Sequence, residues 1–201
     1  DVLLGDASPK DAIVNHVQVD RLDVLPATPD LAAAEVELAT LVDREHVMRT
    51  AIHSVRDAYD FILIDCPPSL GLITINMLVA ADSLLIPLQC EYFALEGLSQ
   101  LLNTIHLIQR KLNEALVIDG VLLTMYDARI NLSRQVASDA REYFGDKVFH
   151  TVVPRNIRLA EAPSFGQPII LYDVSSAGAQ AYPQLATELL QRLSPQTVAV
   201  A

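Results

Sequence analysis

The chain alternates short apolar runs with longer amphipathic segments. Mostly apolar runs occur at residues 61–65, 83–88, 117–125 and 148–153, and Phe61 to Ile64 is uninterrupted. Runs of this length are typical of strands buried on both faces, as in parallel sheets that helices cover on each side. Apolar positions at helical spacing follow these runs at residues 71–80, 95–112, 132–144 and 178–193. We therefore predict strands at the first set of positions and helices at the second.

The remaining segments have weaker patterns. They predict a short helix near residues 9–16, a strand at 22–25, a helix from Pro29-Asp30, an amphipathic helix across about 44–58 capped by Asp43, and a short edge strand at 169–172. Gly145 is expected to end the helix at 132–144. Pro183 must lie in the first turn of the last helix or kink it, because proline has no backbone N–H to donate.

Strands that alternate with helices of this length predict an α/β protein. Its sheet should be doubly wound and mostly parallel, with helices on both faces. A chain of 201 residues suits one domain, and it contains no repeat, low-complexity tract or linker. We therefore expect a single domain across residues 1–201.

Polar residues directly follow the predicted strands, at Asp65–Ser69, Gln89–Glu91, Thr124–Arg129 and Pro154–Asn156. The carboxyl ends of parallel strands form the edge at which such sheets bind ligands. Asp65, followed by two prolines, suits a water-mediated contact to Mg²⁺ on a bound nucleotide. It suits equally well the capping of the helix that follows. The strand ends together favour a ligand site over ordinary loops.

Charge and apolar content limit the possible partners and locations. The formal net charge is −11. Residues 1–100 hold 16 acidic and 5 basic residues, whereas residues 101–201 hold 9 of each, so a local cationic face is compatible only with the second half. No apolar run reaches the length of a membrane span and no secretory signal is visible, so we expect a cytoplasmic protein.

Other chemistry has little support. Cys66 and Cys90 lie beside apolar runs and are more simply buried thiols than a disulfide or zinc site. The five histidines lie in helical or strand patterns and indicate no nucleophile–base pair. With seven glycines, the chain contains neither G-x-x-x-x-G-K-[ST] nor G-x-G-x-x-G, so it cannot cradle a nucleotide phosphate in the usual way.

Four longer motifs occur in order at Leu25–Thr28, Phe61–Gly71, Pro87–Gly97 and Val153–Pro163. Together they resemble the ParA/Soj family of chromosome and plasmid partitioning ATPases, over nearly the whole chain. The resemblance implies a deviant P-loop NTPase fold of the MinD type. It also implies that the intact protein binds ATP and Mg²⁺, forms a homodimer around the nucleotide and associates with the nucleoid by binding DNA nonspecifically. Hydrolysis of ATP would be stimulated by a ParB-type protein.

The same resemblance implies roles for particular residues. Asp65 corresponds to the Walker B acid, held near Mg²⁺ through water, and Cys66, Pro67, Pro68 and Ser69 correspond to switch II. Pro154 and Asn156 match a segment that lines the adenine.

Arg129 and Arg158 correspond to positions implicated in nonspecific DNA contact. Each follows a strand-end turn and can offer a guanidinium group to phosphate without reading bases. The alternative for both is a surface arginine paired with a neighbouring carboxylate, such as Asp127 or Glu161.

The chain also departs from the family pattern. Relatives begin with a strand and a Lys-Gly-Gly-x-Gly-Lys-Thr loop, then a strand that ends in Asp-x-Asp-Pro-Gln, and neither motif is present. We therefore expect the C-terminal part, about three quarters, of the ATPase domain, without its N-terminal strands. Residues 1–201 alone should have little or no ATPase activity. Relatives also often carry arginine in place of Val174 and Ala177, which weakens the expected cationic face.

Two other functions stay open. The chain could be a non-catalytic interaction module, a truncated or degenerate paralogue that retains the dimer or ParB-binding surface. It could also be a MinD-like membrane ATPase, but residues 193–201 offer no basic face to anionic lipid, so we expect no membrane partner.

Overall fold

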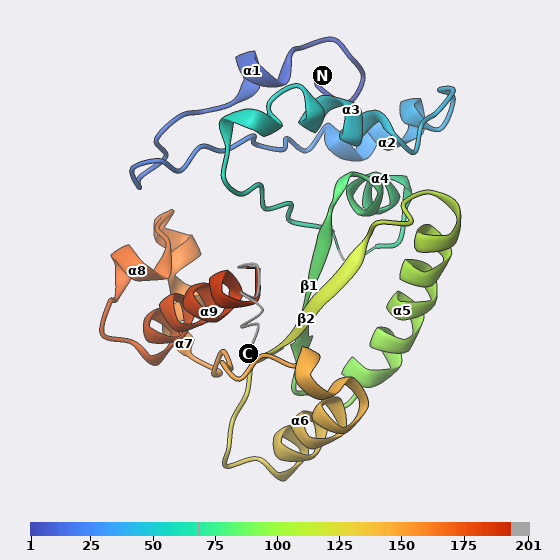
Figure 1. The fold of residues 1–201 in the computed structure, drawn as a ribbon. Helices are drawn as coiled ribbons and strands as arrows, with labels where there is room; N and C mark the ends of the chain where they lie inside the picture. The colour runs from blue at the N-terminus through green and yellow to red at the C-terminus, as the bar shows by residue number, and fades with distance from the viewer. Residues whose placement is uncertain (68, 194–201) are drawn as a thin grey trace, which may run out of the picture. The chain divides into compact units, whose positions relative to one another are not determined.

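The computed structural model describes residues 1–67 and 69–193, shown as a ribbon in Figure 1. The chain forms two compact units. The first consists of Asp1–Asp82 with Leu102–Leu116, and the second of Ser83–Leu101 with the residues from Val117 onward. Pro68 and the tail at 194–201, on which the membrane argument depends, lie outside the described residues.

The first unit is helical. It contains α1 (Pro9–Ala12), α2 (Leu31–Leu38), α3 (Val47–His53), the 3-10 turn η1 (Arg56–Ala58), α4 (Leu72–Ala80) and the second half of α5 (Ala94–Lys111). The amide of Asn76, which is fully buried on α4, donates to the carbonyl of Arg44 at 2.7 Å and accepts from the N–H of Met48 at 3.2 Å. This amide therefore ties α4 to the start of α3, since a buried polar group must be hydrogen-bonded.

The second unit is built on a parallel pair of strands, β1 (Ser83–Gln89) and β2 (Val117–Thr124), with Ile86 opposite Val121 and Leu88 opposite Leu123. The register shifts between Leu84 and Leu85. The helical elements are the first turns of α5, then α6 (Asn131–Phe144), η2 (Gly145–Lys147), α7 (Ile157–Glu161), η3 (Ala162–Phe165), α8 (Ile169–Tyr172) and α9 (Ala177–Leu193). Leu122, Phe149, Val153, Ala181 and Leu185 form a core between the strands and α9.

Gly120 on β2 is required by close packing. A Cβ at this position would lie 2.5 Å from the Phe149 ring and 2.7 Å from the carbonyl oxygen of Lys147. Backbone cannot move aside as a flexible side chain can. Only glycine therefore allows the segment after η2 to approach β2 this closely.

The main predictions of secondary structure are confirmed. The helices α4, α5, α6 and α9 and the strands β1 and β2 lie where the sequence predicts them, and α6 ends at Gly145 with φ 55°. The α/β class with a parallel sheet is also confirmed.

The predicted strand at 61–65 is wrong for this structure. Residues 61–65 form no regular secondary structure, and the strand ladders and bridges among the described residues do not include them. Phe61 is 53% exposed and Leu63 is 87% exposed, so the run is not buried on both faces. An apolar run becomes a strand only where another strand pairs with its backbone, and the sequence pattern does not show whether such a partner exists.

The predicted strand at 148–153 is formed only in part. The N–H groups of Phe149 and Val153 donate to the carbonyls of Val121 and Leu123, both at 2.9 Å. Parallel bridges pair Val148 with Val121 and Pro154 with Tyr126. The N–H groups of His150 and Thr151 donate instead to the Glu188 carboxylate, at 2.8 and 2.9 Å. A side chain thus takes amides that a full ladder would use.

Four smaller predictions also fail or change. Residues 169–172 form the helical turn α8 after Pro168 rather than an edge strand, because a short apolar run does not distinguish the two. The strand at 22–25 is reduced to a single antiparallel bridge between Val14 and Val24. The helix at 44–58 is confined to α3 and η1, and Asp43 does not cap it, because α3 begins only at Val47 and its N-cap is His46. Pro183 lies inside α9, beyond its first turn, so the first-turn alternative is wrong and the kink stays a prediction.

A cluster of charged groups holds the 148–153 segment against α9. Arg192 lies 4.0 Å from the centre of the Phe149 ring and donates to the Val148 carbonyl at 3.0 Å and to Glu188 at 2.8 Å. Burial opposes ionisation of Glu188, but the N–H groups of Thr151 and His150 and the Arg192 guanidinium outweigh it and lower the pKa of Glu188 to about 2.

We predict that Glu188→Gln lowers the free energy of unfolding by about 1–3 kcal/mol at pH 7, because it leaves a backbone amide and Arg192 less well paired. Because the native pKa is depressed, this contribution is complete above the unfolded value of 4.5 and is lost as the pH falls towards 2. Urea unfolding from pH 7 to pH 3 measures it, with Glu142→Gln as the control. An equal difference at both pH values would contradict the assignment.

Candidate functional site

Three of the predicted strand ends meet in the second unit. The N–H of Cys90, after β1, donates to the Thr124 carbonyl at 3.0 Å, and the N–H of Tyr126, after β2, donates to the Val153 carbonyl at 3.2 Å. Arg155 closes the set, donating its N–H to the Tyr126 carbonyl at 3.0 Å. Backbone hydrogen bonds therefore place the loops 89–91, 124–129 and 154–156 beside one another, as expected for the carboxyl ends of parallel strands.

A side-chain contact reinforces this edge. Glu91, after β1, pairs with the guanidinium group of Arg155. Both side chains are about half exposed, so the pair contributes little to stability and mainly fixes the two loops relative to each other.

A shallow groove of about 740 Å³ runs along the carboxyl half of β1 and the first turns of α5. Its walls are mostly apolar and include Leu88, Phe93, Leu98 and Leu132. The rings of Tyr92 and Phe93 meet edge to face, with centroids 5.0 Å apart. The groove is open and its polar groups are few, chiefly Gln89 and Glu91.

Asn156, predicted beside an adenine, has a structural role as the N-cap of α7. Its Oδ1 accepts the N–H of Arg158 at 2.8 Å, and its backbone is extended, as an N-cap requires. Pro154, which is half-buried, lies in the bridge to Tyr126. The capping bond leaves the Nδ2 hydrogens of Asn156 and the nearby backbone as the groups that a ligand would meet.

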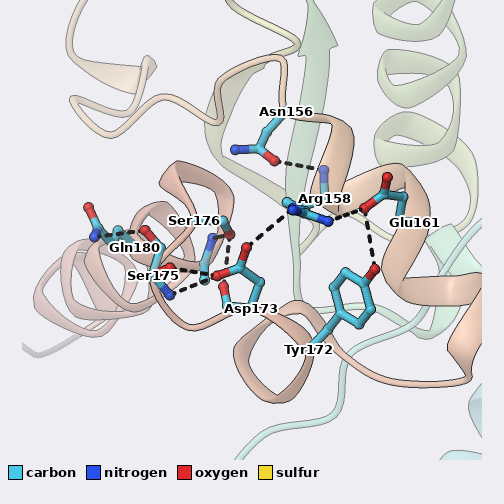
Figure 2. Close-up of polar contacts among 9 residues, drawn as sticks. Asn156, Arg158, Glu161, Tyr172, Asp173, Ser175, Ser176 and Gln180 are labelled. Atoms are coloured by element: carbon cyan, nitrogen blue, oxygen red, sulfur yellow. Dashed lines mark hydrogen bonds and ion pairs between the residues drawn. The ribbon is translucent and has the colours of Figure 1, made fainter.

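Arg158 lies at the centre of the polar network drawn in Figure 2. Its Nη1 donates to Oε2 of Glu161 at 2.8 Å, and its Nε lies 3.4 Å from Oδ2 of Asp173. The hydroxyl of Tyr172 also donates to Glu161, at 3.3 Å. Glu161 first, and Tyr172 after it, raise the pKa of Arg158.

Arg129 is paired differently, with a single carboxylate. Its Nε and Nη2 donate to the two oxygens of Asp127 at 2.9 and 2.7 Å, and its backbone N–H also donates to Asp127 at 3.0 Å. The side chain of Arg129 is 89% exposed and that of Asp127 only 12%. Hydrogen bonds from the Arg129 side chain, then from its backbone, lower the pKa of Asp127 to about 2. Both candidate arginines are thus paired with carboxylates, as the alternative considered for them predicted.

Asp65, Cys66, Pro67 and Ser69 belong to the first unit and precede α4 in the chain. Asp65 and Cys66 are exposed. Partial removal from water and the neighbouring Asp65 charge raise the pKa of the Cys66 thiol, so it stays protonated near neutral pH. The carbonyl of Ser69 accepts the hydroxyl of Thr74 at 2.5 Å, which fixes the end of this segment to α4.

The sequence did not predict the contact between Glu35 on α2 and the backbone at the start of α4. Oε1 of Glu35 accepts the N–H of Leu72, at the start of α4, at 2.5 Å. A Cβ on Gly71 would overlap this oxygen, so the approach requires glycine. Asp173 was also missed as a partner of Arg158, although the sequence Asp173-Val174-Ser175-Ser176 before a helix is a recognisable capping signal.

Metal and membrane contacts can be examined over the described residues. Within residues 1–67 and 69–193, no three His, Cys, Asp or Glu side chains are grouped so that they could hold a metal ion. In the same ranges, none of the helices combines the length and the apolar character needed to cross a membrane.

A family model described as an AAA domain matches residues 1–118. The chain is 57% identical over 189 residues to the sporulation initiation inhibitor protein Soj of Bacillus subtilis, covering 94% of this chain and 74% of that protein. It is 52% identical to the chromosome partitioning protein ParA of Myxococcus xanthus, covering 98% of this chain and 69% of the relative.

Solved structures give the same class. Cobyrinic acid a,c-diamide synthase from Mycobacterium smegmatis, with bound ADP and magnesium, superposes with a TM-score of 0.78 at 36% identity, over 94% of this chain and 69% of the other. The cell division ATPase MinD of Pyrococcus furiosus gives 0.75 at 28% identity, over 95% and 74%. A complex of Cyanothece McdA with ATP, at 19% identity and a TM-score of 0.81 over 94% and 74%, supports the fold alone.

These matches define a P-loop NTPase fold. Within that class, the chain belongs to the Soj/ParA family of chromosome-partitioning ATPases.

We predict that Asn156→Ala lowers the free energy of unfolding by about 1 kcal/mol, because the N–H of Arg158 loses its capping partner. Asn156→Asp retains an acceptor at the same place and should be close to wild type. Thermal unfolding of the three proteins measures the difference. Equal losses in both variants would show that the cap is not the important contact.

Proposed function

We propose that residues 1–201 are the C-terminal part, about three quarters, of a single ParA-type ATPase domain that partitions chromosomes. The observation that carries this proposal is 57% identity to Soj over 94% of the chain. The curated relatives are matched over 69–74% of their own length, which agrees with a partial domain. In the complete protein, ATP-dependent dimers bind the nucleoid nonspecifically, and a ParB-type partner stimulates hydrolysis, in the cytoplasm.

Asp65 is proposed to hold Mg²⁺ through water. Its carboxylate is exposed and follows an apolar run, and carboxylate oxygen suits a hard cation. A single carboxylate is enough for this role because Mg²⁺ keeps several waters and takes other ligands from nucleotide phosphates. Magnesium would neutralise the charge that develops during phosphoryl transfer. Cys66, Pro67, Pro68 and Ser69 are proposed as switch II, and the Ser69 carbonyl accepts the Thr74 hydroxyl at the start of α4.

Pro154 and Asn156 are proposed to line the adenine, largely through the backbone. The support is their position at the edge where three loops converge, directly after a segment aligned with β2. The Asn156 cap fixes the loop, so that its remaining N–H donors are held in one direction.

Arg129 and Arg158 are proposed to contact DNA phosphates. Arg129 has five N–H donors and uses two side-chain donors on Asp127, which leaves three on a side chain that is 89% exposed. Contacts to phosphate carry no sequence information, in keeping with nonspecific binding. A dimer doubles the number of such contacts and so offsets the weakness of each.

We predict that purified residues 1–201 show no magnesium-dependent ATP turnover above background, because their sequence lacks a phosphate-binding loop. The complete protein serves as the positive control. In that protein, Asp65→Asn should lower kcat by at least about tenfold, since it removes a charge that supports Mg²⁺. Turnover by residues 1–201 alone would refute the first expectation, and a wild-type kcat for Asp65→Asn would refute the role of Asp65.

We predict that Arg129→Ala weakens binding of the complete, ATP-bound protein to duplex DNA of every sequence alike. The plot of log affinity against log salt has a negative slope, and its magnitude should decrease by about 0.9 for each phosphate that the variant no longer neutralises. Fluorescence anisotropy across salt concentrations measures this. Arg49→Ala, an exposed arginine on α3, is the matched control. An unchanged affinity and slope for Arg129→Ala would remove it from the DNA site.

A further inference from the structure

Arg158 is held between two carboxylates of its own chain. Glu161 lies one turn along the same helical segment, at 2.8 Å from Nη1, and Asp173 follows α8, at 3.4 Å from Nε. Figure 2 shows the guanidinium group between them. With one positive and two negative charges, the group of three carries a net charge of −1. A DNA phosphate that approaches Arg158 therefore meets two carboxylates that are already in contact with this arginine.

Both carboxylates are themselves fixed. The Tyr172 hydroxyl donates to the same oxygen of Glu161 that binds Arg158. Asp173 accepts from the Ser175 hydroxyl at 2.7 Å and from the Ser175 N–H at 3.1 Å through Oδ1, which leaves Oδ2 towards Arg158. The two acids are thus placed before any ligand arrives, and pairing with Arg158 costs them little side-chain entropy.

Arg129 is not restrained in this way. Asp127 takes one edge of its guanidinium group in a bidentate contact and leaves the other side in water. The side chain of Arg158 is 50% exposed, against 89% for Arg129. A phosphate that meets the free donors of Arg129 lies beside one carboxylate, whereas one that meets the free donors of Arg158 lies beside two, on a side chain that is less exposed.

We propose that Glu161 and Asp173 compete with DNA phosphate for Arg158 and so determine how strongly the protein binds DNA. Asp127 has the opposite role and orients Arg129 towards solvent. This inference rests on the proposed DNA binding and adds to it an internal restraint on one of the two arginines. DNA affinity is then held below what the two arginines would give alone, which favours rapid release.

The test is the double variant Glu161→Gln with Asp173→Asn in the complete, ATP- and magnesium-bound protein. Glutamine can still accept from Tyr172, and asparagine can still accept from Ser175, so the local structure is retained. We expect about two- to fivefold tighter binding to a random-sequence duplex at low salt, the range of exposed ion pairs. The salt slope should steepen by up to about 0.9, because Arg158 then neutralises its phosphate more fully than in the wild type.

Matched controls separate the restraint from a general change of charge. The control for the double variant is Glu142→Gln with Asp146→Asn, which removes the same two charges from exposed positions at the end of α6 and in η2. Glu142→Gln alone removes one charge and is the control for Asp127→Asn. The double variant is also made in an Arg158→Ala background, where its gain should fall to that of its own control. Asp127→Asn should give no gain beyond Glu142→Gln.

The outcomes are distinct. No gain from the double variant, or an equal gain in the Arg158→Ala background, would overturn the competition. A gain from Asp127→Asn as large as that of the double variant would overturn the difference between the two arginines. If the ATP-bound wild type binds no DNA at low salt, the proposed DNA binding itself fails. If Glu161→Gln and Asp173→Asn each give part of the gain, both carboxylates restrain Arg158 as proposed.

Discussion

The parallel hydrogen bonding that joins β1, β2 and the segment 148–154 determines where the candidate site of the second unit lies. Cys90 donates to Thr124, Tyr126 to Val153 and Arg155 to Tyr126, so each loop begins at a position set by its neighbour. The alignment depends on Gly120, which admits Phe149, and on Glu188 and Arg192, which hold the backbone of 148–151 from the side of α9. Disruption of any one of these interactions would displace Asn156 and Arg158 together.

The arginines at this edge differ in the carboxylates with which they form ion pairs. Arg155 joins two loops through Glu91, Arg129 is oriented outward by Asp127, and Arg158 is held between Glu161 and Asp173. In a chain with a net charge of −11, each of these three arginines is thus paired with an acid of the same chain. Local pairing, rather than net charge, determines which guanidinium groups can meet a phosphate.

Much of this arrangement follows from the sequence. The strands β1 and β2 and the helices α4, α5, α6 and α9 were predictable because their apolar periodicity is long and unambiguous. Gly145 was predictable as a helix end because glycine adopts positive φ without strain. The Asp127–Arg129 and Arg158–Glu161 pairs were foreseen as alternatives, since the partners are two and three residues apart.

Other features depend on distant parts of the chain. The run at 61–65 has the composition of a strand, but strand formation depends on a partner that no local pattern reveals. Glu188 accepts from the N–H groups of His150 and Thr151, which lie 38 and 37 positions before it in the sequence. Asp173, which pairs with Arg158, follows the helical turn α8, where the sequence predicted a strand.

The hydrogen bond between Glu35 and the N–H of Leu72 gives the first unit a mechanical property. The segment that precedes α4 is fixed to it at Ser69, and the first turn of α4 is fixed in turn to α2 through this one carboxylate. A displacement of the segment must either pull α2 with it or break the Glu35 contact. The position of helix α2, which is remote in sequence from Asp65, is therefore coupled to the position of residues 69–72.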